Sequence, residues 1–179
     1  MKSVPCALAL LLTAALTPVI AARDSDESLL VFGPAVANVL YPDRSAMACV
    51  EYRYTTGRYH PGPWLALEAT GRDLFVGFGL FLDRPLGRRF MFTPSAGMAI
   101  YQEHDGLGLG SPLEFRAAGE LTYRLARWRF GASFEHYSNA TLSDSNPGTE
   151  IVRVLWVVPL DRSGSPHGGS GLRGLPSAP

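Results

Sequence analysis

The sequence predicts an all-β protein, an eight-stranded antiparallel β-barrel that spans a bacterial outer membrane. Three observations support this prediction. The first 22 of its 179 residues have the features of an export signal. No later stretch is apolar enough, for long enough, to form a membrane-spanning helix. Instead, apolar and polar residues alternate along segments of about ten residues, as in strands that lie between lipid and a polar interior.

The chain is predicted to divide into three parts. Lys2, an apolar run from Cys6 to Ile20 and the small residues Ala21 and Ala22 predict a signal peptide over 1–22, cleaved after one of the two alanines. The barrel is expected over 23–160. The remaining stretch, 161–179, is rich in Gly, Ser and Pro, a composition typical of a disordered tail.

The composition excludes several classes of function. Lysine and arginine number 16, as do aspartate and glutamate, so the net charge is zero and nothing indicates nucleic-acid binding. His60, His167 and the pair His104–Asp105 have no partners at the spacing of a zinc site, so we expect neither a metal nor a cofactor. Loss of the signal leaves Cys49 as the only cysteine, which excludes an internal disulfide.

Eight segments carry the strand pattern. They are expected over 28–38, 45–56, 63–70, 73–82, 90–101, 112–125, 127–139 and 149–159. The first and fifth alternate poorly. The second places tyrosines opposite Glu51 and Arg53, the third places leucines opposite Trp64 and Glu68, and the fourth places large apolar residues opposite glycines.

The last three segments show the pattern most clearly. In 112–125, one parity is mainly apolar, and the other carries charges of both signs, including Glu114, Arg116 and Glu120. The same separation follows in 127–139 and 149–159. We expect the charged parity to face a narrow interior, where arginines and glutamates can pair, because eight strands leave little open channel.

The lengths of the connections predict an orientation. In outer-membrane barrels the short turns face the periplasm and the longer loops face outward. The turn 83–87 and the turn at Ala126 are therefore expected in the periplasm. The stretches 102–111 and 140–149 are expected to form outer loops, and 70–73 is a short outer turn.

Three polar side chains occupy positions of the otherwise apolar parity at the outer end of the last two strands. His136 and Ser138 share the parity of Phe134, and Glu150 shares that of Val152. Polar residues at lipid-facing positions indicate function by default. A serine, a histidine and a carboxylate are the groups of nucleophilic acyl transfer. We therefore expect Ser138 as the nucleophile, His136 as its base and Glu150 as the carboxylate that orients the imidazole. Amides at Asn139 and Ala140, together with the Asn139 side chain, are candidate oxyanion donors.

These residues carry a resemblance to a known family. The run His136-Tyr-Ser-Asn-Ala140, followed by Asn-Pro-Gly and Glu150, closely resembles the lipid A 3-O-deacylases (PagL-type). The resemblance implies an outer-membrane barrel that removes an ester-linked hydroxyacyl chain from lipid A of lipopolysaccharide, through a triad made here of Ser138, His136 and Glu150, with Asn139 at the oxyanion hole. The chain departs from the family at Thr141, where a glycine is expected, and in the tail that follows its last strand.

Two alternatives of other classes remain open from the sequence. One is a structural or adhesive barrel in which the triad residues are idle. The other is a different acyl-processing barrel, such as a phospholipase or an acyltransferase. The expected partners are lipid A in the outer leaflet and the outer membrane itself, with a homodimer left open.

Overall fold

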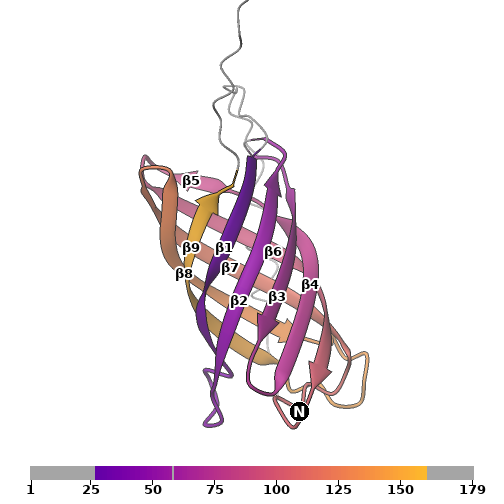
Figure 1. Cartoon of the computed structure of the whole chain (residues 1–179). Coiled ribbons are helices and arrows are strands. Elements are labelled where there is room, and N and C mark those ends of the chain that lie inside the picture. The colour runs from indigo at the N-terminus through magenta and orange to yellow at the C-terminus, as the bar shows by residue number, and fades with distance from the viewer. Residues whose placement is uncertain (1–26, 58, 161–179) are drawn as a thin grey trace, which may run out of the picture.

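The eight long strands are wrapped into a closed barrel (Figure 1). The structure is a computed structural model, and it describes residues 27–57 and 59–160. Its strands are β1 (Glu27–Ala37), β2 (Ser45–Thr55), β3 (Gly62–Ala69), β4 (Asp73–Phe81), β5 (Arg84–Leu86), β6 (Phe90–Glu103), β7 (Leu113–Leu125), β8 (Trp128–Ser138) and β9 (Thr149–Pro159). The predicted signal peptide 1–22 and the predicted tail 161–179 lie outside the described residues.

The strand pairing closes the sheet upon itself. Each long strand is antiparallel to its neighbour in sequence, β4 pairs with β6, and β1 pairs with β9. The predicted eight-stranded antiparallel barrel is confirmed. Because closure leaves no free edge, the backbone groups of all eight strands find partners inside the protein, as hydrocarbon surroundings require. No helix in the described part of the chain is long and apolar enough to cross a membrane.

The short strand β5 is a difference from the prediction. The stretch 83–87 was expected as a turn, but Arg84–Leu86 pairs with Phe90–Phe92 at the start of β6 and forms a small hairpin. Figure 1 shows it at the end of the barrel from which β1 starts. Three residues are too few for an alternation to be visible in a sequence. The hairpin adds to one rim of the barrel and does not enter the ring of eight.

Alternation sorts the side chains into two environments. In β4, Phe75 and Phe81 point inward and are buried, whereas Val76, Phe78 and Leu80 point outward and are exposed. Glycines on the inner parity make room for a large neighbour: a Cβ on Gly79 would lie 2.8 Å from the Trp64 ring and 2.2 Å from a backbone oxygen. The outer surface is therefore broadly apolar, as a wall in contact with lipid should be.

A network of ion pairs occupies the middle of the barrel. Arg153 binds Glu68 at 2.5 Å and Glu135 at 2.8 Å, and Arg116 binds Glu135 at 2.9 Å. Further pairs join Arg53 to Glu51 and Glu120, and Arg116 to Glu51. All these side chains are almost completely buried. The expected pairing of interior arginines and glutamates is present in this layer.

A cluster of apolar and aromatic side chains closes the interior near the outer loops. The Phe75 ring packs at a tilt against both Tyr101 and Tyr137, with ring centroids 4.8 and 4.9 Å apart. Leu109, from the loop between β6 and β7, is fully buried in the same cluster. That loop is held to the rim by Asp73, which accepts hydrogen bonds from the Leu107 amide and the Tyr101 hydroxyl. The outer end is consequently plugged by side chains.

Replacement of Arg153 by methionine should destabilise the barrel strongly. The change removes one cation that contacts the three buried carboxylates of Glu68, Glu135 and Glu51 and leaves them without that partner, an effect of about 3–5 kcal/mol. The readout is the temperature at which heated samples lose the fast gel mobility of the folded barrel. Arg44→Met, at an exposed arginine in the loop between β1 and β2, is the matched control. Equal stability of the two variants would contradict a structural role for the network.

Candidate active site

The three predicted catalytic residues lie at the outer end of the β8–β9 hairpin. His136 in β8 stands directly opposite Glu150 in β9, in the register that pairs Tyr137 with Thr149. On the other side of β8, His136 faces Ala117 and Ser138 faces Phe115. Tyr137 and Thr149 are fully buried, so the alternate positions His136, Ser138 and Glu150 share the outer face.

His136 and Glu150 are in contact. The imidazole Nδ1 is 3.3 Å from Glu150 Oε1, with the histidine side chain 46% exposed and the glutamate side chain 16% exposed. The other carboxylate oxygen, Oε2, is buried without a hydrogen-bond partner among the described residues. Glu150 therefore acts on His136 alone, and it favours the tautomer that carries a proton on Nδ1. Nε2 is left as the acceptor nitrogen.

Ser138 lies on the same face and is half-buried. Within residues 27–57 and 59–160 its side chain makes no hydrogen bond, so the structure does not join it to His136. Residues two apart on a strand are separated by about 7 Å, a gap that an extended imidazole can close by rotation. Catalytic hydrogen bonds are often long until substrate binds, so the missing contact does not by itself exclude Ser138 as the nucleophile.

Asn139 organises the loop that follows. Its side-chain nitrogen donates to the carbonyls of Leu109 and Ser145 and to the Ser143 hydroxyl, at 2.7–3.1 Å. Its side-chain oxygen accepts from the Thr141 amide, and its own amide donates to Asn146. The side chain is fully buried and occupied by the loop. In this conformation it is not placed to meet an oxyanion on the lipid side.

The backbone at Ala140 and Thr141 is unusual. Both residues have positive φ, 52° and 66°, in the left-handed region. For a β-branched residue such as Thr141 that conformation is strained, which explains why a glycine suits the position. The Ala140 amide takes part in no hydrogen bond among the described residues, whereas its two neighbours do. Of the two expected oxyanion positions, Ala140 is the one with an uncommitted amide.

The backbone of Gly148 lies close against the His136 ring. Gly148 is buried and has φ of 68°, and a Cβ there would lie 3.2 Å from His136 Cε1 and 3.1 Å from the Tyr137 carbonyl oxygen. Gly148 belongs to the Asn-Pro-Gly run, which pointed to this site only through the family resemblance. A glycine two residues before Glu150 was nevertheless a signal in the sequence for a close approach of backbone.

The other candidates are elsewhere. Cys49 is a free thiol buried in the interior cluster. His104 contacts Gln102, and His60 contacts a backbone carbonyl, both at exposed positions. No group of three or more potential metal ligands occurs within the described part of the chain.

Comparison with known proteins gives two kinds of match. A family model described as lipid A 3-O-deacylase (PagL) matches residues 45–159. Among solved structures, one titled "Crystal structure of the outer membrane enzyme PagL" superposes with a TM-score of 0.56 at 16% identity, covering 76% of this chain and 100% of that one. A second, from "De novo design of transmembrane beta-barrels", gives 0.54 at 12% identity over 78% and 100%. These structural likenesses show the shared barrel. A search of curated proteins gives no significant match.

Asn139→Ala should loosen the loop 139–148, because it removes the side-chain hydrogen bonds from Asn139 to Leu109, Ser143 and Ser145 and from the Thr141 amide to Asn139. The expected result is faster proteolytic cleavage of this loop in the folded barrel, with an unchanged pattern in Ser138→Ala, which alters the neighbouring residue and none of these bonds. Identical cleavage in the two variants, together with lost activity in Asn139→Ala, would show that Asn139 acts on substrate and not on the loop.

Proposed function

The chain belongs to the lipid A 3-O-deacylase (PagL) family, and on that premise we propose that it removes an ester-linked hydroxyacyl chain from lipid A with Ser138, His136 and Glu150. The family match covers residues 45–159, more than half of the chain, and includes all three residues. The observation that carries the proposal is the contact between His136 and Glu150 on the outer face, at the level where the outer loops begin. A carboxylate on a lipid-facing wall carries a desolvation cost, so its presence at this position indicates a function.

The residues have distinct roles in the proposed reaction. Ser138 Oγ attacks the ester carbonyl carbon while His136 Nε2 takes the hydroxyl proton. Glu150, whose carboxylate contacts His136 Nδ1, stabilises the imidazolium that forms. When the tetrahedral intermediate collapses, His136 returns the proton to the sugar oxygen that leaves. Water then hydrolyses the acyl-enzyme by the same steps, with His136 as base, and releases a hydroxy fatty acid.

The oxyanion of each intermediate needs a donor on the outer face. The Ala140 amide follows the nucleophile by two residues and is not used by the loop. A backbone amide fixed by the surrounding fold can stabilise developing charge without reorganising. We assign this role to Ala140, with Asn139 acting through the conformation of the loop.

The surroundings of the site suit a lipid substrate. Ala117, small and exposed, lies beside His136, and Phe115 and Phe134 lie on either side of it along the outer face. A small residue between larger apolar ones leaves space where an acyl chain can lie against the wall. The substrate is therefore expected to approach sideways within the outer leaflet. The export signal over 1–22 and the outer membrane as the working location form part of the same proposal.

Ser138→Ala and His136→Ala should each abolish release of the acyl chain while the barrel stays folded, because both side chains are on the outer surface. Glu150→Ala should keep about a hundredth to a thousandth of the rate, since water can partly replace an orienting carboxylate. The measurement is mass spectrometry of lipid A from cells that produce each variant, with gel mobility as the test of folding.

Ser133→Ala is the matched control on the same strand. Its side chain points inward to Glu135, so activity should stay near that of the unaltered protein. Loss of activity in Ser133→Ala and not in Ser138→Ala would refute the assigned face. Removal of chains from glycerophospholipids in place of lipid A would identify a different acyl hydrolase, and unchanged lipids would indicate an idle site.

Gly148→Ala should lower the rate by roughly ten- to a hundredfold, because the new Cβ would displace the His136 ring by tenths of an ångström and strain the backbone. Gly87→Ala is the control, since Gly87 also has positive φ, 73°, but no atom within 4 Å of its Cβ position. Both variants carry the same kind of backbone strain, and only the first touches His136. Equal activity in the two would contradict a positioning role for Gly148.

A further inference from the structure

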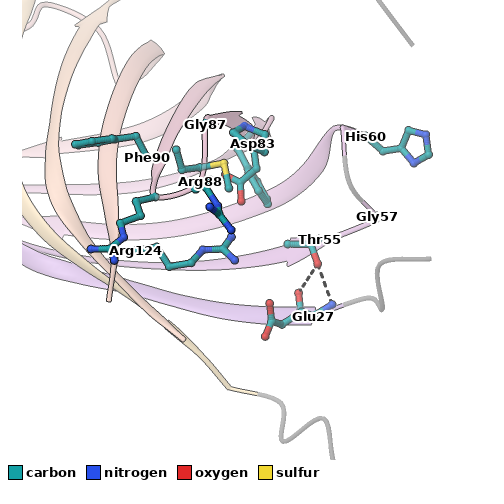
Figure 2. Close-up of a pocket in the computed structure, with 13 residues that line it drawn as sticks. Glu27, Thr55, Gly57, His60, Asp83, Gly87, Arg88, Phe90 and Arg124 are labelled. Carbon is teal, nitrogen blue, oxygen red and sulfur yellow. Dashed lines mark hydrogen bonds between the residues drawn. The ribbon is translucent and has the colours of Figure 1, made fainter. Parts of the chain in front are cut away.

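The end of the barrel opposite the triad contains an open cavity. Its volume is about 570 Å³, and it lies between the first strand and the β5–β6 hairpin. Figure 2 shows Arg88 and Arg124 at this cavity, with Glu27 and Thr55 on another wall and His60 pointing away. This is the end of the short turns, expected to face the periplasm.

The mouth of this cavity is rich in arginine. Arg88 and Arg89 form the tip of the β5–β6 hairpin, and Arg124 lies near the end of β7. Arg127, in the turn to β8, lines an adjoining cavity that also includes Arg124. All four are exposed. Arg89 donates to the Tyr123 hydroxyl. Within the described ranges, Arg88, Arg124 and Arg127 have no carboxylate partner.

The nearest acidic side chain of the hairpin is already engaged. Asp83 forms an ion pair with Arg129 at 2.7 Å and accepts a hydrogen bond from Thr93 at 2.6 Å. Among the described residues that line the cavity, the other carboxylate is that of Glu27 on another wall, so the exposed arginines outnumber the acidic side chains at this end of the barrel. Guanidinium groups bind phosphate oxygens through paired N–H donors, which makes a phosphate the anion best matched to this mouth.

Large apolar side chains adjoin these arginines on the outer wall. Leu86 and Phe90 flank Arg88 and Arg89, and Leu125 and Trp128 flank the turn that carries Arg127. All four apolar side chains are exposed. A belt of apolar and tryptophan side chains marks the edge of the hydrocarbon layer, so the guanidinium groups beside it lie at the depth of lipid headgroups.

We propose that this arginine mouth binds the phosphate headgroup of an anionic phospholipid in the periplasmic leaflet. The ligand is a lipid and not free phosphate because the arginines border an apolar surface along which acyl chains can lie. This site is distant from the triad, and the proposal does not depend on the deacylase function.

The test measures lipid retention by the folded full-length protein. Native mass spectrometry in detergent compares phosphatidylglycerol with the zwitterionic phosphatidylcholine. The unaltered protein should retain phosphatidylglycerol roughly tenfold more tightly. Arg124→Gln/Arg127→Gln should reduce this preference to near equality, whereas Arg44→Gln/Arg72→Gln, which removes two charges at the opposite end, should leave it intact. If the double variant does not fold, Arg88→Gln alone replaces it in the test, and it should lose a smaller part of the preference for phosphatidylglycerol.

Three outcomes would overturn the proposal. Equal retention of the two lipids by the unaltered protein would remove the headgroup preference. An equal loss in both double variants would show general attraction to net charge and not a site. Displacement of phosphatidylglycerol by millimolar inorganic phosphate at constant ionic strength would identify a free-phosphate site.

Discussion

Complete pairing of the backbone is the constraint from which the rest of this structure follows. In a hydrocarbon layer, an unpaired N–H or C=O group costs several kcal/mol, so a sheet must close. Closure is completed here by the β4–β6 and β1–β9 pairings. Once the strands form a ring, successive side chains must face lipid and interior in turn. Every property of the protein then depends on which parity a residue occupies.

Charged residues have opposite consequences on the two faces. Inside, Arg116 and Arg153 share carboxylates such as Glu135, and the network satisfies most of its members with one another. On the lipid face, His136 and Glu150 have only each other among the described residues, and Glu150 Oε2 is left without a partner. The inner network stabilises a filled barrel. The outer pair contributes little to the packing of the barrel and has a desolvation cost on the lipid face, which supports the proposal that it serves chemistry on a lipid.

The strands and the face that each side chain takes could be predicted from the alternation in the sequence. The contacts between side chains and loops could not. Alternation located all eight long strands and placed His136 and Glu150 on one face. In a strand, the face taken by one side chain fixes the faces of all the others. Alternation missed β5, whose three residues show no period. Parity carried to the end of the expected strand places Asn139 inward, as it is found, but alternation does not show the hydrogen bonds that its side chain makes to the loops. The tight packing of Gly148 on His136 needed the fold of the loop, which depends on residues as distant as Leu109.

The two ends of the barrel differ in a way that restricts how a substrate can arrive. At the outer end, Leu109 and the ring cluster around Tyr137 fill the interior, and the same loop is tied by Asn139 to the segment that follows the nucleophile. If the proposed site on the outer wall is the active one, a substrate has no route to it through the filled lumen. In the proposed reaction the substrate reaches Ser138 within the leaflet, with its acyl chain in hydrocarbon and its polar head near the loops. A molecule already embedded in that leaflet meets both conditions, so under this proposal the plugged barrel favours a lipid substrate by geometry before any specific contact forms.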